Sequence, residues 1–570
     1  MNERLSMSEV ELSQEHTEAV ERPRRIINQY DPLVGCLQAD RFLLERYVEA
    51  MLGFADWQDH QIDSVWWDIG EGNMSFYPSK VLVPWPNLRE WLEAGNDLLR
   101  PFVVQTRARG LEVLFSYRMN AGDSGTAFGL SGMLPMKQAH PDWLINWNPD
   151  PNGEPQYRSP WDKNTSLWNF AVPEVRQYKL DILRELAENY DFDGIQLDFA
   201  RCCPVLPIDH QWEHRESLTD FMRSVRRMLL EVAEKRGRPF LLAAKVPENL
   251  EGCHFDGMDI ETWTRERLVD IFALGCRSLD VDIPSFRNLT SGAPIKLYPC
   301  HDCHHASDAY KYPPLEVLRG VCSNWWRQGA DGIQIFNYLC TTKEAWTNAG
   351  GLSTASMLLQ DCQGNQEAYR EIGSPETLRR KNKTFVVQRR AGGHPWLFGW
   401  PEEGKTQSWM YHNSNMLSPL PARLDRHGHC QTLLRLYVGD DVNAGAERGA
   451  SLRLGVLLSD AGSKDLPPEQ RIAPAVVRLP VYGGDGQETI PLPKEILPHV
   501  EVRLNNVPLG APEVDAGWLE FVVQPRQIAP GSNLVGVHVK NMSADRTDDL
   551  QIERVELHVR YRDVQVQIQR

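Results

Sequence analysis

Short apolar runs alternate with longer amphipathic segments between residues 23 and 375. The apolar runs predict strands at 25–28, 64–68, 111–119, 194–199, 240–246, 269–275, 295–300 and 332–338. Helices are expected between them, for example at 40–52, 173–190, 216–235, 260–268 and 314–328. Strict alternation of strands and helices predicts a parallel sheet of the α/β class. Eight repeats predict that this sheet closes into a (β/α)8 TIM barrel.

The pattern changes after about residue 376, where the helical periodicity fades. Alternating runs appear at 384–389, 431–438, 451–458, 475–482, 500–504, 519–523, 534–539 and 552–564, with turn residues between them. This spacing is typical of an antiparallel β-sandwich. The predicted organisation is therefore a disordered or loosely held arm at 1–22, a barrel catalytic domain at 23–375 and a β-sandwich accessory domain at 376–570.

Composition restricts the classes of function. The chain has 570 residues and a net charge of −16, which argues against nonspecific nucleic-acid binding. No apolar run approaches about 20 residues, so no membrane span is expected. The polar N-terminus lacks the apolar region of a secretory signal, which predicts a cytoplasmic protein with reduced cysteines. Glycine-rich phosphate loops and the Gly-x-Ser-x-Gly nucleophile elbow are both absent from the sequence, and we expect no cofactor.

The segment 190–201, YDFDGIQLDFAR, is the most informative stretch of the chain. It predicts a turn followed by a short strand that ends in the carboxylate of Asp198. Barrels of this class carry their chemistry at the C-terminal ends of the strands. The string DGIQ occurs at 193–196 and again at 331–334. We interpret Asp193 and Asp331 as turn residues that open strands, and the two glutamines as candidates for pocket lining.

The other predicted strands also end in polar or aromatic residues, which would converge on the same face of a closed barrel. The substrate-binding candidates at these ends are Trp67, Asp68, Glu71, Arg118, Asn120, Arg201, Lys245, Tyr298, His301, Gln334 and Asn337. Trp66, Trp67 and Tyr298 are candidates for stacking on sugar rings. Three of the cations, Arg118, Arg201 and Lys245, suit an acidic sugar. They would equally serve to balance the nearby carboxylates.

The strings SYRMN (116–120), HPDW (140–143), VPEVRQYKLDILRELAENYDFDGIQLDFAR (172–201) and VDI (269–271) resemble the glycosyl-hydrolase-like-10 family. The resemblance extends over about 60–375 and is strongest at 172–201. It implies a (β/α)8 barrel grouped with glycoside hydrolases, and a carbohydrate as the partner. Asp198 matches the terminal Asp of the family's strand-four motif. Members commonly place an acidic or aromatic residue after that Asp, where this chain has Phe199-Ala200-Arg201.

Hydrolysis of a glycosidic bond usually requires two carboxyl groups. The sequence assigns Asp198 as nucleophile or base. Asp282 is the first choice for the acid, because a strand-six acid facing a strand-four carboxylate resembles other retaining α-glycosidase barrels. By position, the alternative acids are Asp280, Glu248, Asp68 and Glu71. Retaining and inverting mechanisms both stay open, because sequence does not supply the carboxyl separation.

The string CHDCHH at 300–305 matches a C-x-x-C-H haem-attachment pattern, which we reject without an export signal. The alternative interpretations of function are a carbohydrate-binding barrel without turnover, and a metal-dependent hydrolase or lyase that uses the His301–His305 cluster. Neither interpretation indicates an oligomeric state.

Overall fold

The computed structural model divides the chain into two compact units. Unit 1 comprises residues 1–303, 329–373 and 392–414, and unit 2 comprises residues 304–328, 374–391 and 415–570. The described residues are 12–32, 43–69, 74–120, 134–145, 167–199, 204–208, 210–276, 278–302, 310, 313–338, 341–350, 362–389, 418–425, 427–443, 451–460, 463, 465–473, 475–481, 484–540 and 550–561. Within these ranges, no helix is long and apolar enough to cross a membrane.

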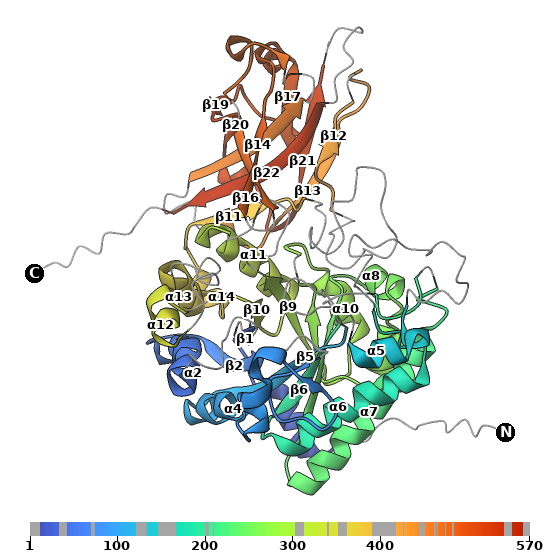
Figure 1. The fold of residues 1–570 in the computed structure, drawn as a ribbon. Coiled ribbons are helices and arrows are strands. Elements are labelled where there is room, and N and C mark those ends of the chain that lie inside the picture. The colour runs from blue at the N-terminus through green and yellow to red at the C-terminus, as the bar shows by residue number, and fades with distance from the viewer. Residues whose placement is uncertain are drawn as a thin grey trace, which may run out of the picture. The chain divides into compact units, whose positions relative to one another are not determined.

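Unit 1 is built around a closed ring of eight parallel strands, coloured blue to yellow in Figure 1. The strands are β1 (Ile26–Tyr30), β2 (Ile62–Trp67), β5 (Glu112–Arg118), β6 (Gly194–Asp198), β7 (Leu241–Val246), β8 (Ile271–Leu274), β9 (Lys296–Asp302) and β10 (Ile333–Phe336). Their order around the ring follows the chain, and β10 pairs with β1 to close it. Each of the eight strands overlaps a predicted one. The TIM-barrel prediction is confirmed.

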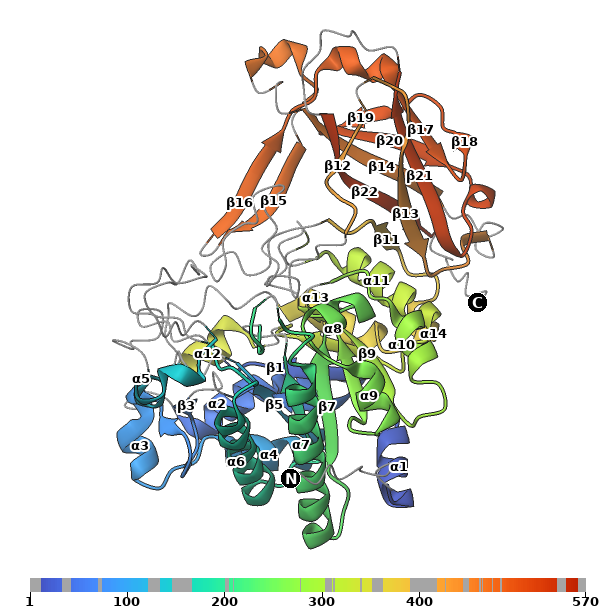
Figure 2. The same cartoon turned by 90° about the vertical axis from the view of Figure 1, so that its right-hand side faces the viewer.

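Helices follow the strands on the outside of the ring. They are α2 (Leu44–Leu52), α3 (Arg89–Glu93), α4 (Leu99–Ala108), α5 (Pro135–Ala139), α6 (Pro173–Asn189), α7 (Arg215–Arg236), α8 (Leu250–Phe255), α9 (Ile260–Arg265), α10 (Ile283–Leu289), α12 (Lys343–Asn348) and α13 (Cys362–Glu371). A two-stranded element, β3 (Met74–Ser75) with β4 (Val83–Pro84), lies between β2 and α3 in the chain. Both ribbon views show α6 and α7 side by side (Figures 1 and 2).

The N-terminal segment differs from the loosely held arm that we predicted. Its described part forms helix α1 (Gln14–Glu21), capped by Ser13. Val20 is fully buried in a cluster with inward-facing barrel residues such as Ile27 and Leu241. His16 is also buried, and its Nε2 lies 2.9 Å from Oδ1 of Asp270. Two buried side chains on an eight-residue helix explain why this part of the segment is ordered.

Three aspartates join adjacent strands by hydrogen bonds at the N-terminal end of the ring. Asp193 accepts a hydrogen bond from the backbone N–H of Val113 at 2.9 Å. Asp270 and Asp331 accept in the same way from Leu242 at 2.7 Å and from Leu297 at 2.8 Å. Each carboxylate stands directly before β6, β8 or β10 and ties it to the strand before it in the ring.

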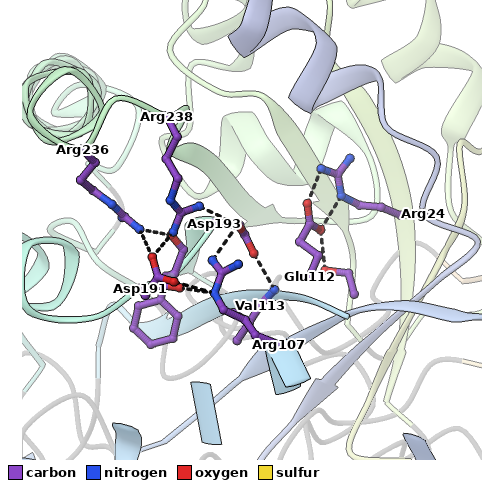
Figure 3. Close-up of polar contacts among 10 residues, drawn as sticks. Arg24, Arg107, Glu112, Val113, Asp191, Asp193, Arg236 and Arg238 are labelled. Carbon is purple, nitrogen blue, oxygen red and sulfur yellow. Dashed lines mark hydrogen bonds and ion pairs between the residues drawn. The ribbon is translucent and has the colours of Figure 1, made fainter. Parts of the chain in front are cut away.

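An arginine completes each of these junctions. Figure 3 shows Arg107 and Arg238 converging on Asp193, each at 2.8 Å from its Oδ1. Arg226 binds both oxygens of Asp270, and Arg287 reaches Asp331 at 2.6 Å. The Asp193 and Asp331 positions of the DGIQ repeat therefore have a structural role, as we interpreted them.

The glycines of the repeat are required by close strand approach. A Cβ on Gly194 would lie 2.6 Å from the carbonyl oxygen of Leu241. A Cβ on Gly332 would lie 2.0 Å from the carbonyl oxygen of Arg24. These distances are shorter than van der Waals contact. Any larger residue would push neighbouring backbone away.

Unit 2 contains two antiparallel sheets around one core. The first has the order β11 (Lys383–Val386), β22 (Leu550–Arg560), β14 (Ser451–Asp460), β20 (Trp518–Val523) and β19 (Glu513–Asp515), with β12 (Ala422–Arg423) also on β22. The second has the order β13 (Thr432–Val438), β21 (Gly531–Val539), β17 (Val500–Leu504) and β18 (Val507–Pro508). Inward-facing residues of both sheets share one hydrophobic cluster. The predicted antiparallel sandwich is confirmed.

Three further elements of unit 2 lie outside those sheets: the hairpin β15 (Ala475–Val481) with β16 (Gly484–Ile490), and the helices α11 (Leu315–Gln328) and α14 (Pro375–Leu378). Helix α11 packs tightly on β11, where a Cβ on Gly320 would lie 2.2 Å from the carbonyl oxygen of Thr384. The side chain of Asn324 donates to the carbonyl of Tyr437 at 3.2 Å and accepts from the N–H of Gly439 at 2.7 Å.

Candidate active site

Polar side chains occupy the barrel interior at the C-terminal ends of the strands. Successive side chains of a strand alternate between the interior of the ring and its outer face. Towards the N-terminal end the interior is an apolar cluster that includes Ile27 and Leu241. One step further along the strands lie Gln29, Asp68, Ser116, Arg118, Gln196, Asp198 and Lys245, which are all buried and joined by polar contacts. This polar layer is where barrels of this class place their chemistry.

Asp198 is the last residue of β6 and is 2% exposed. Its Oδ2 accepts a hydrogen bond from Nε2 of Gln29 at 3.3 Å, and Nζ of Lys245 lies 4.0 Å from the same oxygen. A buried carboxylate is costly unless it is paired and hydrogen-bonded. Gln29 and Lys245 together meet that requirement from two other strands.

A second carboxylate, Asp68, lies close to Asp198. Its Oδ1 is 3.2 Å from Nε of Arg118, whose Nη2 also donates to Asp31 at 2.7 Å. Its Oδ2 accepts from the same Gln29 nitrogen at 3.5 Å. Because both carboxylates lie within 3.5 Å of one atom, their nearest oxygens are at most about 7 Å apart. That limit includes the roughly 5 Å carboxyl spacing of retaining glycosidases.

Lys245 is fully buried on the neighbouring strand β7. Its Nζ donates to Oε1 of Gln29 at 2.5 Å and lies 4.7 Å from the ring centre of Phe336. Burial opposes its charge, but Cys300, Cys276 and Asp198 outweigh burial, so the pKa of Lys245 is raised above its usual value. The amine therefore stays protonated and balances the charge of Asp198.

The ion pairs weaken the sequence argument for an acidic sugar. Arg118 is already paired with Asp31 and Asp68, and Lys245 with Asp198. Neither cation is left with an unbalanced charge for a substrate carboxylate. For these two residues, the alternative interpretation of charge compensation fits the structure. Arg201, the third cation, lies outside the described residues.

His301 does not face this interior. In β9 it is flanked by Cys300, which clusters with Phe336 inside the ring, so alternation directs His301 to the outer face. It is fully buried, and neither ring nitrogen has a partner among the described residues. Burial lowers the pKa of His301 to about 4, although Asp302 opposes the shift. The structure therefore places a neutral imidazole behind the strand, and this position gives no support to the predicted substrate-binding role.

The predicted sugar-stacking aromatics belong to the protein core. Trp66 and Tyr298 lie in the apolar cluster towards the N-terminal end of the barrel. Trp67 points outward, where its Nε1 donates to Thr106 of α4 at 2.9 Å and its ring packs on Phe102. All three aromatic side chains are at most 1% exposed. The structure packs these three side chains among core residues and gives no support to their predicted contact with substrate.

The side chains of two predicted site residues, Asn120 and Asn337, form hydrogen bonds with backbone groups and do not line an open cavity. Asn120 donates to the carbonyls of Trp168 and Pro204 and accepts from the N–H of Trp168 at 3.0 Å. Asn337 has a φ of 52°, and its Oδ1 accepts from the N–H of Asp31 at 2.9 Å. Asparagine tolerates this left-handed conformation better than most residues. Both side chains are committed to the backbone that surrounds the polar layer.

Gln334 lies inside the barrel, in register with the inward-facing Ile27 and Cys300. Its side chain is fully buried, and neither its Oε1 nor its Nε2 has a partner in the described part of the chain. Buried amides are nearly always hydrogen-bonded, so this site is suited to an ordered water or a ligand atom. Gln334 remains a candidate for pocket lining.

The predicted acid, Asp282, is exposed and caps helix α10. Its Oδ1 accepts from the N–H of Ser285 at 3.4 Å. Its own N–H donates to the carbonyl of Glu248 at 2.9 Å, so these two acids are neighbours on the loops after β8 and β7. Glu248 is the more buried of the two, at 6% exposed. Asp68, by contrast, shares the Nε2 donor of Gln29 with Asp198.

Some predicted residues lie outside the described ranges, namely Glu71, Arg201, His304 and His305. Among the residues that the structure does describe, no group of three or more His, Cys, Asp or Glu side chains is arranged to hold a metal ion.

Gln29 is the functional candidate that the sequence analysis missed. The predicted first strand ended at residue 28, whereas β1 extends to Tyr30. The sequence feature that could have revealed Gln29 is its spacing from Ile27. The two residues are two positions apart, so in a strand they lie on the same face. One residue added to the strand would have placed this amide among the carboxylates.

Residues 42–204 match the family described as Glycosyl hydrolase-like 10. The match confirms the resemblance over this segment, which includes β2, β5, β6 and Asp198. The protein thus contains a glycosyl hydrolase-like TIM barrel, and its substrate is unspecified. No curated protein matches the chain.

The chain is also similar to several solved structures. The chain is 14% identical to the PgaB (BpsB) glycoside hydrolase domain from Bordetella bronchiseptica, covering 62% of this chain and 99% of that one, with a TM-score of 0.38. It is 12% identical to an alpha-amylase from Geobacillus thermoleovorans, covering 91% and 100%, with a TM-score of 0.38.

The chain spans 57% of a cycloisomaltooligosaccharide glucanotransferase from Paenibacillus sp., at 7% identity and a TM-score of 0.33. That alignment covers 94% of this chain.

Proposed function

We propose that this protein is a glycoside hydrolase, with Asp198 as its nucleophile or base. The observation that supports this most directly is the pair of buried carboxylates, Asp198 and Asp68, held at most about 7 Å apart at the C-terminal end of the barrel. Glycosidases place two carboxyl groups on either side of the bond that is cleaved. The family match over residues 42–204 agrees with this chemistry.

Each carboxyl has a distinct proposed role. Asp198 would attack the anomeric carbon or activate water, because it ends the strand of the family motif. Asp68 forms an ion pair with Arg118, and we assign it the stabilisation of an oxocarbenium-like transition state and not proton donation. The acid is then proposed to come from Asp282 or its neighbour Glu248 on the loops after β8 and β7.

The test uses the purified full-length chain and a panel of aryl α- and β-glycosides and oligosaccharides. Asp198→Asn should lower kcat by at least about 100-fold while the protein keeps its fold. Asp193→Asn is the matched control, because it changes the same residue type at the opposite end of the same strand. That control should keep its turnover per folded molecule. Equal turnover in the Asp198 variant and the wild type would exclude the proposed role.

Leaving groups identify the acid. A variant that lacks the acid still cleaves glycosides whose leaving group needs no proton, but fails on poor leaving groups. We therefore expect either Asp282→Asn or Glu248→Gln to show this split, whereas Asp198→Asn should lose both kinds of substrate. If neither variant shows the split, the acid does not come from these loops.

A carbohydrate-binding protein without turnover is the second candidate. It is favoured by one observation, that Arg118 and Lys245 already neutralise the two carboxylates. In that case the panel would show saturable binding of a glycan by calorimetry and no release of reducing ends.

A further inference from the structure

Gln29 stands at the centre of the polar layer, yet it is neither a carboxylate nor a cation. It is the fourth residue of β1, and its fully buried side chain points into the barrel. Its amide contacts Ser116, Asp198 and Lys245 on three other strands, and Asp68 directly after β2. An amide is a neutral group whose nitrogen can donate to carboxylates while its oxygen accepts from an amine.

The chemistry of the partners fixes the orientation of this amide. The ammonium of Lys245 only donates, so it must face Oε1 of Gln29. The nitrogen Nε2 then faces Ser116 at 2.9 Å, Asp198 at 3.3 Å and Asp68 at 3.5 Å. Turning the amide over would place an oxygen against two carboxylates and a nitrogen against an ammonium. Only one of the two amide orientations is stable.

The two hydrogens on that nitrogen have separate tasks. The hydroxyl of Ser116 donates to Oε1 of Gln196 at 2.8 Å, so its oxygen is free to accept one hydrogen from Gln29. The second hydrogen is left for the two carboxylates, which share it. Asp198 and Asp68 are therefore coupled through a single N–H, and Lys245 is coupled to both through the dipole of the same amide.

We propose that Gln29 is a positioning residue, which holds the carboxyl groups of Asp198 and Asp68 at a fixed separation and keeps Lys245 beside them. This inference rests on the proposed function, because the held geometry is that of a glycosidase carboxyl pair. A hydrogen bond to the charged form of a carboxyl favours that form. Loss of this amide removes the group that holds both carboxyls in place, and an added negative charge at position 29 repels them.

The first experiment measures the coupling without any need for turnover. Gln29→Met, Asp198→Asn and the double variant are unfolded in urea at neutral pH, together with the wild type. We expect the double variant to lose less unfolding free energy than the two single variants lose in sum. Removing either partner already breaks the same contact, so the second substitution costs less. Gln61→Met is the matched control: Gln61 is another buried glutamine, whose Oε1 accepts from the N–H of Gly373 at 2.8 Å. The unfolding free energies lost by Gln61→Met and by Asp198→Asn should be additive.

The second experiment separates positioning from a purely structural role. In the active enzyme, Gln29→Met should lower kcat by about 10- to 100-fold and change KM little. Gln29→Glu should move the acid limb of the pH profile of kcat/KM upwards by about one unit or more, because it adds a negative charge beside Asp198. Gln61→Met should leave the acid limb in place.

The outcomes distinguish this inference from the proposed function. If no glycoside is cleaved but the urea cycle shows coupling, the hydrolase proposal fails and the buried Gln29–Asp198 contact still stands. Additive stability losses, or turnover with an unmoved acid limb in both Gln29 variants, would overturn the positioning role while leaving the hydrolase proposal intact.

Discussion

At the scale of single residues, strand alternation decides which polar groups reach the site. His301 and Lys245 are both buried near the C-terminal ends of their strands, yet only Lys245 faces the interior. Lys245 finds an acceptor and a carboxylate there, and it stays charged. On the outer face His301 has neither of these among the described residues, and its pKa falls to about 4. Of two polar residues with similar burial, one is thus charged and the other neutral.

His301 makes stability depend on pH. Its folded-state pKa of about 4 lies below the unfolded value of roughly 6.5, so the unfolded chain binds the proton more tightly. The stabilisation is complete above pH 6.5 and is lost as the pH falls towards 4, with a slope of up to about 1.4 kcal/mol per pH unit. We expect His301→Leu to remove this part of the acid sensitivity in urea unfolding at pH 7.0, 5.5 and 4.5. An unchanged slope between variant and wild type would contradict the assignment.

At the scale of elements, the barrel repeats one junction between paired strands. Before β6, β8 and β10, an aspartate accepts the N–H of the second residue of the preceding strand and pairs with an arginine. The backbone closes the same junction, because the N–H of each aspartate donates to the carbonyl of the residue whose N–H it accepts. The DGIQ repeat in the sequence marks two of these three junctions, those before β6 and β10.

Two substitutions at Asp331 separate its two contributions. Asp331→Asn keeps an oxygen for the N–H of Leu297 but loses the charge that pairs with Arg287. Asp331→Ala loses both, and a buried N–H without a partner costs about 1–3 kcal/mol. The expected order of unfolding free energy is wild type, then Asp331→Asn, then Asp331→Ala. Equal stability of the two variants would mean that the strand N–H gains nothing from this acceptor.

At the scale of the whole molecule, the N-terminal helix is part of the barrel unit. Helix α1 contributes Val20 to the barrel's apolar cluster and His16 to the Asp270–Arg226 pair. Arg24, which follows the helix, donates to the carbonyls of Val20 and Ala19 and binds Glu112 of β5 at 2.7 Å. Residues more than 80 positions apart in the chain thus meet at the N-terminal end of the ring.

Val20→Asp tests whether α1 stabilises the barrel. A charge in that apolar cluster is unfavourable, so either the carboxyl is neutralised or the helix undocks. Both outcomes lose the stabilisation from the buried valine, which is roughly 1.5–3 kcal/mol. The melting temperature should fall by several degrees. Gln14→Asp is the control, since it adds the same charge at an exposed position in the first turn of the helix, where a carboxylate is favourable. An equal effect of both variants would mean that the helix is not docked.

The sequence by itself determined the class of each domain, the eight barrel strands and the placement of Asp198 at a strand end. Hydrophobic periodicity records which face of an element is buried, and that is local information. Only the tertiary structure decided which of the polar strand ends are neighbours. Gln29 and Lys245 are 216 residues apart, and no local pattern links them. Likewise, only the packed barrel placed Trp67 and Tyr298 in the core and His301 on the outer face, because a side chain's surroundings are set by strands and helices that are distant along the chain.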